Sequence, residues 1–376
     1  MRYRRMPIEV ESPEQLGYST ITNNLSESSV SDRRLSDLGL DLDIDDLLLC
    51  YGDHLGDPAL REAIVAASGG EPSGLGPEHV LVTPGAAAAL FCVATALVGP
   101  GEHLVVQRTN YATNLETPRA IGADLTTIDL AYDGGFRLDV DAVAAAVRPG
   151  TTRLISVTTP HNPTGVCLES ADLHRLVEIA ESSGAVLLVD ETYRDLTHNP
   201  AGPPPIAATL SPRVVSVASM SKAYGLPGLR VGWAVTSSPE LGELLLAAKE
   251  QIVICGATLD EHIAGRVLAA RGRILPPIVA DVRRRLETVR TWMAGQDTFE
   301  WVEPAGGVVG FVRFRDGVQV DTESFYARLL ADFGTYVGPG HWFESSDRSF
   351  RLGFGWPTHD ELAAGLAALS ACAAGG

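Results

Sequence analysis

The sequence predicts an α/β protein in which a large domain with a mostly parallel sheet is followed by a smaller α+β domain. Three observations lead to this prediction. The chain has 376 residues, which is too long for one simple core. Beyond about residue 78, short runs rich in β-branched residues alternate with longer segments rich in Ala and Leu. After Gly256, long helical patterns flank a few strands instead.

The domain organisation follows from these patterns. We expect an N-terminal segment (1–50) that joins the small domain, a large domain (51–256) and a small C-terminal domain (257–376). Seven strands should form the sheet of the large domain, and several are apolar on both faces: 79–83, 103–107, 125–129, 153–159, 185–190, 214–220 and 231–235. The small domain should contain strands at 308–314 and 349–355 and helical stretches at 259–295, 321–332 and 358–373.

Charge and cysteine content narrow the function classes. The net charge of -18 argues against binding to nucleic acid and to anionic membranes, because both need clustered Lys and Arg. The five cysteines are scattered, with no spacing typical of a zinc site or a disulfide framework, and we expect no metal and a reducing cytoplasm. The N-terminus leads into no apolar run, so no signal peptide is expected. The uncharged stretch 80–101 is interpreted as a strand, a turn and a buried helix.

Lysine is nearly absent from this chain. Among 29 Lys and Arg residues only Lys222 and Lys249 are lysines. Lys249 lies on the polar side of an amphipathic helical pattern, so we expect a solvated surface charge. Lys222 follows an apolar strand, in ASMSKAYGLPGLRVG, among small residues and turn formers. A primary amine condenses with a carbonyl group and guanidinium does not, so Lys222 is a candidate for covalent chemistry that Arg cannot replace.

Other polar residues also stand where predicted strands end. Asp190 ends the strand in VLLVDETYRDL, although an aspartate there can simply cap the next turn. Asn162 follows a strand in TTPHNPTGV, which on its own is a good turn. VTPGAAAAL places Gly85 at a strand-to-helix junction, where free backbone N–H groups favour an anion. Arg351 lies in an apolar strand, so a partner or an anionic ligand is expected.

The segment SMSKAYGLPGLRVGW resembles the Schiff-base lysine segment of fold-type-I enzymes that use pyridoxal 5'-phosphate (PLP), in the class I/II aminotransferase group. The resemblance covers nearly the whole chain, with the motifs in the family's order, and implies an aspartate-aminotransferase-like fold. It implies that Lys222 carries PLP, that Asp190 pairs with the pyridinium nitrogen, and that Asn162 and Tyr193 contact the phenolic oxygen.

The resemblance also implies roles for the remaining residues. Phosphate ligands would be Gly85, Ala86, Ala87, Ser219 and Arg230, although Ala86 and Ala87 lack the hydroxyl that many relatives have. Tyr111, in QRTNYATN, would stack on the pyridine ring, and Arg351 would bind the substrate α-carboxylate. Tyr51, in CYGDHLGDPALREAI, would reach the phosphate of a neighbouring subunit, which implies a homodimer with shared active sites.

The implied reaction is transamination between an L-amino acid and a 2-oxo acid. The stretches NNLSESSVSD and CYGDHLGDPALREAI resemble enzymes of cyclic arginine-derived amino acids in peptide-antibiotic pathways, of the capreomycidine synthase and enduracididine aminotransferase types. We therefore hypothesise that Glu27 recognises a guanidinium group, with a solvated turn glutamate as the alternative. The alternative function is that of a cyclising or eliminating lyase, or of an oxidase, that acts on an arginine derivative.

Three other classes are disfavoured. A nucleotide-binding dehydrogenase would need GxGxxG and an α/β hydrolase would need GxSxG, and neither motif occurs. A PLP-binding transcription factor would need an N-terminal DNA-binding domain, and the acidic first fifty residues leave no room for one.

Overall fold

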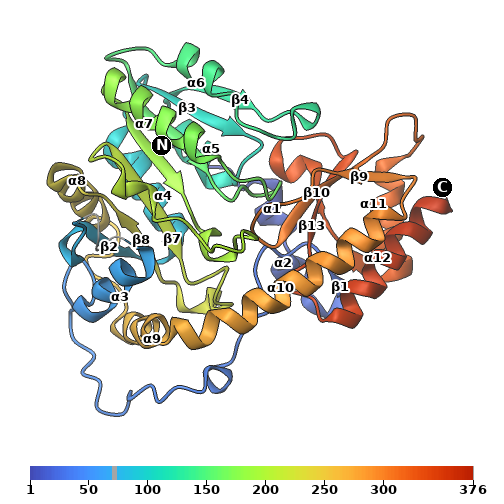
Figure 1. Cartoon of the computed structure of the whole chain (residues 1–376), viewed down its shortest axis with the longest axis horizontal. Helices are drawn as coiled ribbons and strands as arrows, with labels where there is room; N and C mark the ends of the chain where they lie inside the picture. Colours follow the sequence, from blue (N-terminus) through green and yellow to red (C-terminus); the bar gives the residue numbers. More distant parts are fainter. Residues whose placement is uncertain (70–73, 376) are drawn as a thin grey trace.

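The computed structural model describes residues 1–69 and 74–375. A seven-stranded sheet, in the order β2-β8-β7-β6-β5-β3-β4, forms its centre (Figure 1). Strand β8 runs antiparallel to both of its neighbours, β2 and β7, and the other pairs in this sheet are parallel. The strands are β2 (Val80–Thr83), β3 (His103–Arg108), β4 (Asp124–Asp129), β5 (Thr152–Thr158), β6 (Val186–Asp190), β7 (Val214–Ser219) and β8 (Gly232–Val235).

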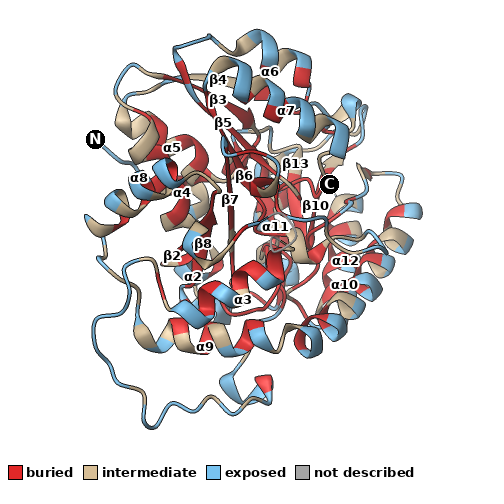
Figure 2. Ribbon diagram, turned by 60° about the vertical axis from the view of Figure 1, so that its left-hand side comes forward, coloured by how far each residue is buried: buried red, intermediate tan, exposed pale blue. Residues whose placement is uncertain are grey.

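Helices cover both faces of this sheet. Alternate residues of β6 face opposite sides, because successive side chains of a strand point in opposite directions. Leu187 and Val189 pack with the helices α6 and α7, whereas Val186 and Leu188 pack with α4 and α8. Figure 2 shows the resulting buried strands between more exposed helices. The helices here are α3 (Pro58–Ser68), α4 (Gly85–Leu97), α5 (Ala112–Ile121), α6 (Val140–Ala146), α7 (Ser170–Ser183), α8 (Pro239–Glu250) and α9 (Thr258–Ala269).

The C-terminal part of the chain forms a second, four-stranded antiparallel sheet in the order β12-β13-β10-β9. Phenylalanine rings fill the space beneath it, with Phe299 and Phe314 centred 4.9 Å apart and Phe314 and Phe325 5.0 Å apart. The elements are β9 (Phe299–Trp301), β10 (Val309–Phe314), β12 (Gly338–Pro339), β13 (Ser349–Gly353), α10 (Arg271–Ala294), α11 (Thr322–Phe333) and α12 (His359–Ala374).

The N-terminal segment packs on this second region. It begins with two short helices, α1 (Pro7–Val10) and α2 (Pro13–Leu16), and then β1 (Asn23–Asn24) pairs in parallel with β11 (Thr335–Tyr336). The stretch that leads to α3 then loops out beside α9 and is mostly exposed (Figures 1 and 2). The sequence had suggested only turns at 1–50, so α1 and α2 were not predicted.

The fold class predicted from the sequence is confirmed. All seven expected strands of the large sheet form, within one or two residues of the expected ends. The stretch 80–101 forms β2 and the buried helix α4, as expected. The stretch 259–295 contains two helices, because the backbone at Ala270 is not helical and separates α9 from α10. None of the helices within residues 1–69 and 74–375 is both long and apolar enough to cross a membrane.

Candidate active site

A cavity of about 420 Å³ lies where the large sheet, the C-terminal region and the N-terminal segment meet. Several of its polar residues come from the carboxyl ends of parallel strands or from the turns just after them. Asp190 ends β6 and Ser219 ends β7, while Asn162 follows β5 and Tyr111 follows β3. Since parallel strands end at the same edge of a sheet, residues far apart in sequence meet there.

Lys222 and Asp190 both face this cavity. The Lys222 Nζ donates a hydrogen bond to the Ser28 hydroxyl at 2.9 Å. Asp190 Oδ1 accepts hydrogen bonds from the Thr192 hydroxyl at 2.6 Å and the Thr192 N–H at 3.1 Å. Burial raises the pKa of Asp190, and the Thr192 hydrogen bonds and the Lys222 charge oppose that rise. A buried carboxylate of this kind is stabilised by a cationic partner within the cavity.

The predicted phosphate residues form a compact cradle. Gly85 begins α4 with φ +79°, and Ala86 and Ala87 in its first turn line the cavity. A Cβ added to Gly85 would lie 2.5 Å from the Arg230 Nη2, so only glycine allows this guanidinium so close to the helix start. The N–H groups of the first helical turn have no partners within the helix, and together with Arg230 and Ser219 they suit an anion.

Two buried side chains have unused hydrogen-bonding atoms that belong to the cavity lining. The Tyr193 hydroxyl is buried and has no partner among the described residues. The same is true of Arg351 Nε, although Arg351 Nη1 donates to Asn162 Oδ1 at 3.1 Å and Nη2 to the Ser26 carbonyl at 2.6 Å. Burial lowers the pKa of Arg351. Because a buried unpaired polar group is costly, these atoms indicate bound ligands.

Glu27 also lines the cavity, as the guanidinium hypothesis requires. Burial raises the pKa of Glu27; the positive charges of Lys222 and Arg351 oppose the rise, and the nearby Glu14 adds to it. Glu27 is therefore a partly buried acid close to the positive charges of Lys222 and Arg351.

Tyr51 lies apart from this group. Its side chain is 83% exposed, in the loop before α3, and does not line the cavity of its own chain. A role for Tyr51 therefore requires a second copy of the chain.

The prediction for Lys249 was wrong. Lys249 is fully buried, and its Nζ donates to the His54 carbonyl at 2.5 Å. Burial lowers the pKa of Lys249, while the nearby Glu261 opposes that effect. Lys249 lies four residues after Leu245 and eight after Leu241, so it shares the buried face of α8 with these leucines and is not on the polar side. The spacing to these leucines was visible in the sequence, but the carbonyl that accepts from the buried amine belongs to the distant segment at His54.

Several cavity residues were not predicted. Ser28 contacts the Lys222 amine, and Thr192 contacts Asp190. The centre of the Trp342 ring lies 5.8 Å from the Cζ atom of the Arg351 guanidinium. The N-terminal segment also contributes lining residues, among them Glu9 and Glu14. The acidic, serine-rich composition of residues 1–50 was visible in the sequence, but nothing in it indicated which side chains reach the cavity.

The fold and this site define a PLP-dependent enzyme of the aspartate-aminotransferase-like fold. The chain belongs to the family described as aminotransferase class I and II, whose model matches residues 37–369. It is 36% identical to a capreomycidine synthase of Streptomyces vinaceus, over 87% of this chain and 82% of the relative. It is 30% identical to an arginine–pyruvate transaminase of Pseudomonas aeruginosa, over 81% and 77%. The crystal structure of the PLP-dependent cyclase OrfR superposes with a TM-score of 0.85 at 30% identity, covering 99% of this chain and 97% of that one.

The residues in the cavity fit PLP. Gly85, Ser219 and Arg230 would surround its phosphate, and Asp190 would lie at its ring nitrogen. The unpartnered Tyr193 hydroxyl would donate to the phenolic oxygen, with Asn162 beside it. Lys222 is the lysine that lines the cavity, so it is the residue available to bind the aldehyde. The Ala86 and Ala87 positions supply backbone N–H groups and no hydroxyl.

Proposed function

We propose that this enzyme transfers the amino group of a guanidino L-amino acid to a 2-oxo acid. The observation that carries the proposal is the position of Glu27, an acid that faces the same cavity as Lys222 and Arg351. Arg351 would bind the α-carboxylate, and Glu27 would bind a cationic side chain at the other end of the substrate. Similarity to an arginine–pyruvate transaminase supports arginine or a derivative as the amino donor.

PLP, when bound, supplies an electron-accepting ring joined to the substrate nitrogen. The residues of the chain orient and deprotonate the substrate. Arg351 binds the carboxylate through its free Nε and its remaining N–H groups, which directs the α-carbon toward Lys222. The Lys222 Nζ, positioned by Ser28, takes the proton from the α-carbon. The Asp190 carboxylate would lie at the ring nitrogen of PLP, and its negative charge would stabilise the positive charge on that nitrogen.

The test is transfer of ¹⁵N from labelled arginine to pyruvate, measured as labelled alanine together with the 2-oxo acid of arginine. Citrulline is the matched control substrate, because it has the shape of arginine without the charge. We expect transfer from arginine, much weaker transfer from citrulline, and none in Lys222→Ala. Glu27→Gln should raise the KM for arginine roughly 10-fold or more, which corresponds to loss of one charge-assisted hydrogen bond. An unchanged KM for guanidino substrates in Glu27→Gln would overturn the role of Glu27.

A cyclising or eliminating lyase, or an oxidase, acting on an arginine derivative is the second candidate. It is supported by the likeness to capreomycidine synthase and to the PLP-dependent cyclase OrfR. The same assay separates the two functions. A lyase would consume the arginine derivative and leave the 2-oxo acid untouched, and an oxidase would consume dioxygen.

We further propose that two copies form a dimer with shared active sites. Large apolar side chains are exposed on the loop before α3 and on the start of the α8–α9 connection, namely Leu48, Leu49, Tyr51, Ile252 and Ile254. The Thr258 hydroxyl donates to the Cys50 carbonyl at 2.9 Å, so the two segments are adjacent. Burial of such a patch would favour association. Light scattering should give twice the mass of the chain, and a monomer at micromolar concentration would contradict this proposal.

Location in a reducing cytoplasm is also a proposal. It is supported by the five cysteines, all of which are free thiols in the structure. Fractionation of the native host would test it.

A further inference from the structure

The N-terminal residues 7–20, here called the strap, cover one side of the cavity. Glu9, Ser12, Pro13 and Glu14 of the strap are among the cavity-lining residues. The strap is bound to the C-terminal region through Glu11, whose carboxylate accepts hydrogen bonds from His341 Nε2 at 2.8 Å and from Trp342 Nε1 at 2.7 Å. The strap is thus fixed at its middle, directly beside the cavity.

The two glutamates of the strap that line the cavity, Glu9 and Glu14, differ in their hydrogen bonds. Glu9 accepts a hydrogen bond from the Met6 N–H at 2.8 Å and so caps α1. The Glu14 carboxylate has no hydrogen bond or ion pair with any other described residue. Glu14 nevertheless lies close enough to Glu27 to raise the pKa of that carboxyl group. Two neighbouring carboxylates repel each other, and a cation between them would relieve the repulsion.

Tyr18 connects the strap to Glu27. Its hydroxyl donates to Glu27 Oε1 at 3.4 Å. Burial raises the pKa of Tyr18, and the charges of Glu27, Glu14 and Asp32 raise it further, so three carboxylates surround this phenol. Tyr18 therefore stays neutral, and its hydroxyl, as the hydrogen-bond donor, positions the Glu27 carboxylate.

The other side of the Tyr18 ring rests on a fixed surface. Tyr18 stacks on Trp356, with ring centres 5.9 Å apart and planes 11° from parallel. The Trp356 indole N–H donates to Asp32 at 3.1 Å, and its carbonyl accepts from the Ser31 hydroxyl at 2.7 Å. Two aromatic rings with acids at their edges attract a planar cation such as guanidinium.

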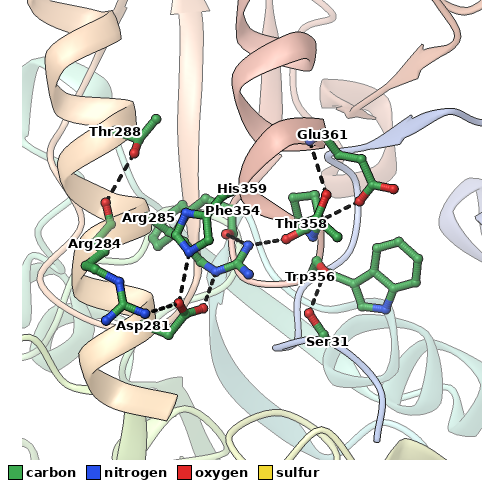
Figure 3. Close-up of polar contacts among 11 residues, drawn as sticks. Ser31, Asp281, Arg284, Arg285, Thr288, Phe354, Trp356, Thr358, His359 and Glu361 are labelled. Carbon is green, nitrogen blue, oxygen red and sulfur yellow. Dashed lines mark hydrogen bonds and ion pairs between the residues drawn. The ribbon is translucent and has the colours of Figure 1, made fainter. Parts of the chain in front are cut away.

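Figure 3 shows why Trp356 is fixed. The turn between β13 and α12 carries Trp356, and the buried Arg285 of α10 donates to the carbonyls of Phe354 and Pro357 in this turn. Arg285 Nε in turn donates to Asp281 at 2.5 Å. Trp356 and Asp32, here called the frame, thus lie behind Tyr18 and are anchored to α10, whereas Glu14 belongs to the strap.

We propose that Glu14 is a specificity-determining residue and that, with Glu27 and Tyr18, it binds the distal cation of the substrate between the strap and the frame. This inference rests on the proposed function, because it assigns the residues that select a cationic side chain. Ligand binding in this cavity is independently indicated by the unpartnered Tyr193 hydroxyl and Arg351 Nε within the described chain. Arg351 fixes one end of the substrate, and Glu14 closes over the other end.

The experiment compares Glu14→Gln with Glu9→Gln in the holoenzyme. Both variants remove one negative charge from the cavity lining, but Glu9 is committed to its helix cap. The measured quantity is the ratio of kcat/KM for arginine to kcat/KM for citrulline. We expect Glu14→Gln to lower this ratio about 10-fold through the KM for arginine, and Glu9→Gln to change it less than twofold. Tyr18→Phe should lower the ratio in the same direction by a smaller factor.

A second readout follows the strap itself. Hydrogen exchange of residues 7–20 should slow more with saturating arginine than with saturating citrulline, and this difference should vanish in Glu14→Gln. A wild-type enzyme that does not prefer arginine over citrulline would overturn the proposed function and the inference together. If the wild type prefers arginine and Glu14→Gln keeps the full preference, the inference alone fails. Equal loss of preference in Glu9→Gln and Glu14→Gln would also refute it, because general cavity charge would then explain selectivity.

Discussion

Gly85→Ala tests the phosphate cradle most directly. The substitution acts in two ways, because Gly85 has φ +79° and because the new Cβ would lie 2.5 Å from Arg230 Nη2. Gly101 provides a matched control, since it has φ +77° and nothing within 4 Å of its added Cβ. Gly101→Ala therefore has the backbone strain of Gly85→Ala without the contact.

The expected magnitudes follow from this geometry. Left-handed backbone costs alanine about 1–2 kcal/mol, so both variants should lose a similar amount of folding stability. In Gly85→Ala the flexible Arg230 side chain must also move by roughly 1 Å to reach ordinary contact distance. A charge-assisted hydrogen bond is worth about 1.5–3 kcal/mol, so the phosphate should bind roughly 10- to 150-fold more weakly.

The assay is calorimetric titration with pyridoxamine phosphate, which has the same phosphate as PLP but cannot form an imine with Lys222. Thermal unfolding of the two variants without ligand measures the strain they share. We expect comparable melting temperatures for both variants and weakened binding only in Gly85→Ala. Wild-type affinity in Gly85→Ala, or an equal loss in Gly101→Ala, would refute the assignment of Arg230 and Gly85 to the phosphate.

Three further predictions concern titratable groups. Burial raises the pKa of Glu191 to about 7, so its contribution to stability should be lost as pH rises from about 4.5 through 7, and Glu191→Gln should abolish this decline in urea unfolding. Burial lowers the pKa of His161 to about 4, so the free energy of unfolding should fall by about 3 kcal/mol as pH falls from 6.5 to 4. A His161→Gln variant with the same decline would contradict this. Burial opposes ionisation of Asp281, but Arg285 and His359 lower its pKa to about 2; Asp281→Asn leaves Arg285 without its charged partner and should cost about 2 kcal/mol in denaturant titration at pH 7.

Much of the cavity could be predicted because several of its residues lie at the ends of strands. Asp190 and Ser219 end β6 and β7, and Asn162 follows β5, so a parallel sheet brings them to one edge whatever the loops do. The apolar runs that identify these strands are local properties of the sequence. Local patterns therefore determined both the strands and the common location of the residues at their ends.

Interactions between distant segments could not be predicted in this way. The stacking of Tyr18 on Trp356 joins residues more than 330 positions apart, and neither residue lies in a motif. Ser28 contacts Lys222 because the N-terminal segment crosses the lysine loop, where the Val30 N–H donates to the Lys222 carbonyl at 3.2 Å. No periodicity in residues 1–50 indicates that crossing.

The two lysines show the division between sequence and tertiary structure. Amino-acid chemistry alone determined that a chain almost without lysine has a candidate imine-forming residue at Lys222, because an amine at a strand end can do what guanidinium cannot. The same reasoning placed Lys249 in solvent, and only the tertiary structure showed it to be buried beneath the segment at His54. The physical reason is that residue type determines which chemistry a side chain can perform, whereas burial of a charged group depends on a polar partner that a distant segment supplies.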